Sequence, residues 1–270
     1  MRKFLIAALV VVTAVTGVSV FAIADEGKQG TSWTFTFSAR TAASATGSNS
    51  VIEPAKVDDK GTADESDDRY VAPSVSTIKF PVGSGIDTTV LPVCKKSPSD
   101  VQRGDAKCPA NTKIGSGLAN SVIGQNDENK GTELIAPIEA FNRKNEILFH
   151  VRPCAPGTGP GKGRPCEELT ASTVVLIGKW SKVTTQPTLR VPTPAALLQG
   201  GVTITRFQLK TAKKTKKVTR TVDGRKRIIV RSYATTPGKC RRSKVWKSSA
   251  MEQYQDGSKH TIPDSQTCRS

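Results

Sequence analysis

Short runs of alternating large and small residues, separated by turn-forming residues, restrict the fold of this chain more than any other feature. Trp33-Thr34-Phe35-Thr36-Phe37 alternates with a period of two, which places Trp33, Phe35 and Phe37 on one face of a strand. Comparable runs recur at roughly 8–12 residue spacing. The pattern predicts an all-β protein, folded as one disulfide-stapled β-sandwich with long loops and Greek-key-like connections from about Gly30 to Ser270.

The other strands can be assigned to apolar or β-branched segments between the turns. We expect them at 51–52, 75–80, 114–119, 122–123, 134–141, 146–151, 173–178, 202–209, 228–230, 244–254 and 258–262. Residues 134–141 and 146–151 are expected to pair as a hairpin across 142–145, and Asp256-Gly257 is a strong hairpin dipeptide. Only Pro194 to Leu198 suggests a helix, of a single turn.

The first residues have the layout of a secretory signal. Arg2 and Lys3 precede an apolar run that ends in the small-x-small site Ala22-Ile23-Ala24. We therefore expect a signal peptide at 1–24 and a mature secreted domain at 25–270, outside the cell or in the cell envelope. The run is close to the length that spans a bilayer, so an uncleaved anchor is the alternative. After cleavage we expect no transmembrane segment.

Six cysteines in an exported chain predict three disulfides. Fifteen pairings are formally possible, and the spacing favours the local one, in which each couple encloses its own turns. The local pairs are Cys94–Cys108, Cys154–Cys166 and Cys240–Cys268. Closing loops of this size stabilises a fold by about 3 kcal/mol each in the chain-entropy model. Structural zinc is not expected, because the chain has no Cys-x-x-Cys couple.

Positive charge is concentrated near the end of the chain. Residues 201–270 contain 18 Lys and Arg against four acids, whereas residues 25–200 are nearly balanced. The densest stretch flanks the dipeptide Asp223-Gly224, and if 215–231 is a protruding hairpin it concentrates positive potential at one end. The candidate polyanion-binding residues are Lys213, Lys214, Lys216, Lys217, Arg220, Arg225, Lys226 and Arg227, with Lys210 and Arg231 beside them. The alternative is a solvated surface that keeps the protein soluble.

No arrangement of residues predicts a catalytic site. Only His150 and His260 could serve as a histidine base, and no serine lies in a Gly-x-Ser-x-Gly elbow. Glu139 and Glu146 could meet across the expected hairpin as paired carboxylates, but such pairs arise easily by chance. The sequence therefore predicts a non-enzymatic protein with no cofactor and no resident metal.

An acidic cluster between Asp58 and Asp68 leaves one alternative open. Its carboxylates could supply the oxygens that calcium requires, although the spacing is not that of an EF-hand. The other interpretation is a solvated flexible loop. The sequence does not decide between the two.

Three motifs carry a resemblance to a known family. They are Phe80-Pro81-x-Gly83 followed by Leu91-Pro92-x-Cys94, then Cys108-Pro109 followed by Ile114-Gly115-Ser116-Gly117, and finally the Asp256-Gly257 turn between Cys240 and Cys268. Together they resemble a family of uncharacterised secreted actinobacterial proteins. The resemblance implies an exported all-β domain with a C-terminal Asp-Gly hairpin closed by cysteines, and it implies no activity.

The sequence thus predicts a non-catalytic secreted or envelope-associated protein with a binding or structural role. One alternative is a module that binds a polyanion, such as an anionic cell-wall polymer, or a carbohydrate at the cell surface. A second is a secreted hydrolase with an unrecognised site. Nucleic acid is not expected as the native partner, because the basic stretch lacks the aromatic residues on which bases stack. The sequence does not predict the oligomeric state.

Overall fold

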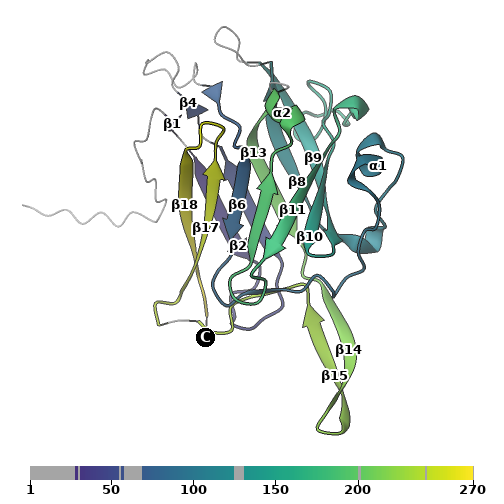
Figure 1. Ribbon diagram of the computed structural model, residues 1–270, viewed down its shortest axis with the longest axis vertical. Helices are drawn as coiled ribbons and strands as arrows, with labels where there is room; N and C mark the ends of the chain where they lie inside the picture. Colours follow the sequence, from purple (N-terminus) through teal and green to yellow (C-terminus); the bar gives the residue numbers. More distant parts are fainter. Residues whose placement is uncertain are drawn as a thin grey trace, which may run out of the picture.

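An eleven-stranded antiparallel sheet forms the body of the protein and curls nearly into a barrel (Figure 1). The computed structural model describes residues 28–29, 31–54, 56–57, 69–124, 131–199, 202–240 and 242–269. The predicted signal peptide at 1–24 and the acidic cluster at 58–68 lie outside these residues. The all-β class predicted from the sequence is confirmed, and its core lies inside this one curled sheet.

In spatial order the strands of the sheet are β18 (Lys259–Thr267), β17 (Val245–Gln253), β6 (Val75–Lys79), β12 (Thr188–Pro192), β11 (Val174–Ser181), β10 (Glu146–Val151), β9 (Thr132–Arg143), β8 (Lys113–Ile123), β13 (Val202–Thr211), β3 (Ser48–Glu53) and β2 (Ser32–Phe37). Strands β8 to β12 form a meander, whereas β6 and β13 are inserted through long connections. Strand β12 was not predicted from the sequence.

The two ends of the sheet meet without a backbone ladder. Because neighbouring strands are antiparallel and their number is odd, the edge strands β2 and β18 run in the same direction. Side chains of β18 join them instead. Gln266 accepts from the Phe37 N–H at 2.7 Å and donates to the Phe37 carbonyl at 2.9 Å, and Asp264 accepts from the Phe35 N–H. We call this junction the seam.

The inward residues of the strands fill the barrel with aromatic and aliphatic side chains. Trp33, Phe35 and Phe37 are all buried, as the alternation predicted. Phe35 contacts Phe80 edge to face, with ring centroids 4.9 Å apart. The predicted two-sided strand is confirmed, because on β11 Leu176 belongs to the interior and Val175 to a second cluster outside the barrel.

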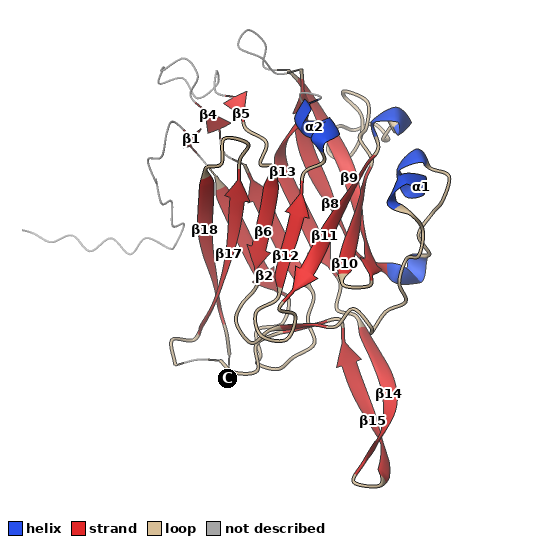
Figure 2. Cartoon of the chain, viewed as in Figure 1, coloured by secondary structure: helices blue, strands red, loops and turns tan. Residues whose placement is uncertain are grey.

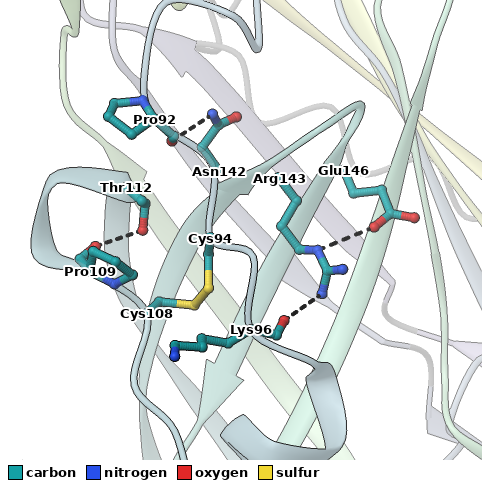
Figure 3. The surroundings of a disulfide bond; sticks show 9 residues. All are labelled: Pro92, Cys94, Lys96, Cys108, Pro109, Thr112, Asn142, Arg143 and Glu146. Carbon is teal, nitrogen blue, oxygen red and sulfur yellow. Dashed lines mark hydrogen bonds and ion pairs between the residues drawn. A yellow bond between two sulfur atoms is a disulfide. The ribbon is translucent and has the colours of Figure 1, made fainter.

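A loop that carries helix α1 (Pro98–Arg103) covers that second cluster on the outer face of β9, β10 and β11. This helix was not predicted from the sequence, in which only Pro194 to Leu198 suggested a helix. Ser97 caps the helix by accepting from the Asp100 N–H, and the helix ends at Gly104, whose φ of 81° suits glycine. Figure 3 shows the disulfide that holds this loop, beside Asn142, which donates to the Pro92 carbonyl at 3.0 Å.

The three local disulfides form as predicted: Cys94–Cys108, Cys154–Cys166 and Cys240–Cys268. The last joins the strand pair β17–β18 to the segment before it, and the Asp256-Gly257 turn lies between the two strands. The hairpin of β9 and β10 is tighter than predicted, because β9 continues to Arg143 and only Lys144-Asn145 remain as the turn.

The remaining elements are short. Helix α2 (Ala195–Gln199) is the single turn expected from the sequence, and it lies at the end of the barrel where β17 ends and β13 begins (Figure 2). The other short elements are β1 (Lys28–Gln29), β4 (Lys56–Val57), β5 (Arg69–Tyr70), β7 (Gly85–Ile86), β16 (Ala234–Thr235) and the 3-10 turns Ala110–Thr112 and Thr170–Ser172.

Candidate functional site

The basic stretch forms a two-stranded hairpin that projects from the barrel at the end opposite α2 (Figures 1 and 2). Strands β14 (Thr215–Val222) and β15 (Arg225–Ser232) pair only with each other. Asp223 and Gly224 connect them with φ angles of 50° and 75°, the positive values that a tight hairpin turn of this kind requires. The predicted protruding hairpin is confirmed.

The register assigns the cations to two faces. Lys216, Arg220, Arg225 and Arg227 share one face, which we call the basic face. Arg220 and Arg227 are direct cross-strand partners on it, a like-charge pairing that destabilises a ribbon. Lys217 and Lys226 lie on the other face.

Most of the predicted polyanion-binding residues lie on the β14–β15 hairpin, but some of them lie outside it. Lys213 and Lys214 lie in the connection from β13 to β14, and Lys210 lies within β13 in the main sheet. None of the eight predicted binding cations forms an ion pair with a described residue. No acid of the described residues therefore compensates their charge.

Arg231, at the base of the hairpin, has a different role from its neighbours. Its guanidinium pairs with the Asp87 carboxylate and donates to the Thr89 hydroxyl at 2.7 Å. Burial opposes ionisation of Asp87, yet the hydrogen bonds from Thr89 and Arg231 hold its pKa below the ordinary value. Arg231 thus fixes the base of the hairpin to the loop after β7, and its charge is not free for a partner.

Two apolar residues are exposed on the face opposite the basic one. Ile228 and Val230 are 72% and 58% exposed. The strand at 228–230 was expected from the sequence, but the exposure of its side chains was not. The basic residues on both sides of this run indicate the exposure, because a strand among unpaired cations has no core against which to pack.

The residues considered for chemistry form an ion network on the outer face of the sheet. Glu139 pairs with Lys113 at 2.6 Å and with Arg152 at 3.6 Å, and it lies opposite His150 across β9 and β10. Burial opposes ionisation of Glu139, but the hydrogen bond and charge of Lys113 hold its pKa below the ordinary value. Burial and the charge of Arg152 lower the pKa of His150.

The pairing of Glu139 with Glu146, which the sequence left possible, does not form. Because the turn contains two residues instead of four, Glu146 lies opposite Arg143 and pairs with it at 3.5 Å. Each carboxylate of this region has a cationic partner, so the region is an ion network that supports the sheet. Paired carboxylates of the kind that hydrolyse a sugar bond are not formed here.

Within the ranges given above, no three acidic, histidine or cysteine side chains are grouped so as to hold a metal ion. Likewise, no helix in the described part of the chain is long and apolar enough to cross a membrane.

Comparisons of the chain with protein-family models, with curated proteins and with solved structures return no match. The resemblance to secreted actinobacterial proteins therefore stays a prediction. The argument for function rests on the geometry of this molecule.

Proposed function

We propose that the protein is a non-catalytic, secreted or envelope-associated binding protein that holds an anionic polymer through the β14–β15 hairpin. The observation that carries the proposal is the isolated position of the hairpin cations. They project from the barrel on a ribbon of their own, and no described acid neutralises them.

Electrostatics supports this assignment. Like charges at this density repel one another, and a polyanion relieves the repulsion while releasing its own counter-ions. The screening length at physiological ionic strength is about 8 Å, so a ribbon held away from the barrel has its strongest effect on a partner that contacts it directly. Cations on both faces suit a flexible chain that can contact either side.

Three local disulfides support the extracellular part of the proposal. Disulfides persist in oxidising compartments, which include the cell exterior and the periplasm. A protein in such a compartment is exposed to anionic polymers of the cell wall.

The test is retention of the purified protein on immobilised heparin over a salt gradient. The variant Lys216→Ser, Arg220→Ser, Arg225→Ser, Arg227→Ser removes the basic face. We expect it to elute at clearly lower salt, and its affinity to depend less steeply on salt concentration, because fewer counter-ions are released.

A matched control removes four exposed lysines elsewhere: Lys95→Ser, Lys107→Ser, Lys162→Ser and Lys179→Ser. It carries the same net charge as the hairpin variant, and we expect it to elute close to the wild type. Equal elution of the two variants would show that only net charge matters and would overturn the proposal.

Anionic phospholipid vesicles form the second arm of the test, because Ile228 and Val230 are exposed. Binding to vesicles without retention on heparin, lost in Ile228→Ser with Val230→Ser, would reassign the hairpin to a lipid surface. We expect the opposite result, in which this double variant is retained on heparin like the wild type.

A further inference from the structure

The interior of the barrel contains a cavity of about 110 Å³. Its wall includes Trp33, Phe35, Phe80, Phe149 and Trp180. At the α2 end the wall is completed by Thr193 and Leu197, which are only partly buried. An apolar cavity of roughly 150 Å³ takes up a benzene molecule, so this smaller cavity is of a size for a short chain of a few carbon atoms.

One acidic side chain faces this apolar space. On β17 the inward positions are Trp246, Ser248, Ala250 and Glu252, and Glu252 lines the cavity with 0% of its surface exposed. Its Oε2 accepts from the Tyr254 hydroxyl at 2.7 Å. Its Oε1 is buried and has no hydrogen-bond partner among the described residues.

A buried carboxyl oxygen without a partner is costly. Leaving a charged or polar group unsatisfied in an apolar interior costs more than the hydrogen bond itself contributes. Burial accordingly raises the pKa of Glu252 to about 7, although the hydrogen bond from Tyr254 opposes the shift. An apolar residue would fill the site without this cost, so the carboxyl is a candidate for recognising a ligand.

The surroundings of Glu252 contain few other titratable groups. Tyr254 lies on its own strand, and His260 is its cross-strand partner on β18. On the other side β6 presents Ser76, which does not titrate. Asp264, further along β18, is engaged with the Phe35 N–H. Of these titratable groups, Glu252 is the one that lines the cavity.

The chemistry of the wall selects the class of ligand. A carboxylate accepts hydrogen bonds from an ammonium group, and the faces of Trp and Phe rings attract a cation. We propose that the cavity binds a small organic ammonium ion, with Glu252 as the partner of its nitrogen and the aromatic side chains around its apolar part. An anionic ligand would be repelled by the same carboxylate.

The test uses three short-chain ligands of similar size: propylammonium, 1-propanol and propanoate. Isothermal titration calorimetry of the full protein at pH 8 should show binding of propylammonium at least tenfold tighter than that of either other ligand. Lowering the pH from 8 to 6 should weaken propylammonium binding roughly tenfold, because the carboxylate is then largely protonated. 1-Propanol should show no such dependence.

Two variants test whether Glu252 is the group that recognises the ammonium ion. Glu252→Gln keeps the size of the side chain and removes its charge, and it should bind propylammonium and 1-propanol alike at both pH values. Glu133→Gln, an exposed carboxyl on β9, is the matched control and should behave as the wild type. If Glu252→Gln does not fold, the pH dependence of the wild type still decides.

Three results would overturn the proposal. The first is equal binding of the ammonium and the alcohol by the wild type, which would show that the carboxyl is not used. The second is preference for propanoate, which would point to the Trp33 indole N–H, a buried donor with no partner among the described residues, as the polar contact. The third is absence of binding by all three ligands at millimolar concentration.

Discussion

The two ends of the barrel use charge in opposite ways. At one end the β14–β15 hairpin exposes a set of cations to solvent, and no described acid pairs with the eight that the sequence singled out. At the other end one carboxyl, Glu252, is enclosed by aromatic walls. Exposed charges are hydrated and screened, so their mutual repulsion costs less stability than burying them would. Burying a charge costs stability, so the Glu252 carboxyl stands without a like-charged neighbour among the aromatic walls, and burial raises its pKa.

The largest expected difference between the ends is in packing. Phe35→Ala removes a ring from the interior, and we expect it to lower the free energy of unfolding by about 3–5 kcal/mol. Ile228→Ala removes a side chain that is 72% exposed on the hairpin, and the change should stay within about 0.5 kcal/mol. Chemical denaturation of both variants measures the contrast. A loss of more than about 2 kcal/mol for Ile228→Ala would mean that the hairpin packs against the barrel.

The second expected effect is a pH dependence of stability that comes from Glu252. Its pKa is about 7 in the folded protein against 4.5 for the free side chain. Between these values the unfolded chain is ionised while the folded protein holds its proton. Raising the pH through this window therefore favours unfolding, by about 3 kcal/mol in all.

Other carboxyls of the protein also contribute to the pH dependence of stability. The contribution of Glu252 is therefore measured as a difference between the wild type and a variant that lacks this carboxyl. The free energy of unfolding of the wild type minus that of Glu252→Gln should fall between pH 4.5 and 7 and stay level above. Asp87 and Glu139, whose pKa values are lowered, act at lower pH and with the opposite sign in both proteins. A level difference across the window would show that Glu252 is hydrated in solution.

The smallest expected effect concerns the base of the hairpin. Arg231→Ala removes the contacts with Asp87 and Thr89, and because these groups are partly exposed the loss of stability should be at most about 1 kcal/mol. Hydrogen exchange should be faster at the amides of β14 and β15 and unchanged in β17 and β18. Equally faster exchange in the barrel would contradict the view that the hairpin is an independent unit.

The sequence predicted those parts of the structure that depend mainly on residues close together in the chain. The alternation at Trp33 to Phe37 gave the buried face of β2, and the two Asp-Gly dipeptides gave two hairpins. Helix α1 was missed because a serine, a proline and an aspartate within four residues begin helices as readily as turns. Tertiary contacts with the outer face of the sheet decided between the two.

The candidate sites show the same limit. The basic hairpin was visible as a run of charge, whereas Glu252 was one acid in a strand whose orientation the sequence did not determine. Its inward position follows from the register of β17 with β6 and β18, strands that the chain brings together from distant segments. Glu139 and Glu146 were misjudged for a related reason, since two residues fewer in a turn change every cross-strand partner.

The seam between β2 and β18 has a consequence for how copies of the protein meet one another. Free strand edges recruit further strands, which is the route by which sheets grow into fibrils. Here Asp264 and Gln266 occupy the amides of Phe35 and Phe37, and Pro263 contributes no amide hydrogen to the edge of β18. The same side chains that hold the sheet curled thus leave a second copy little edge on which to add a strand.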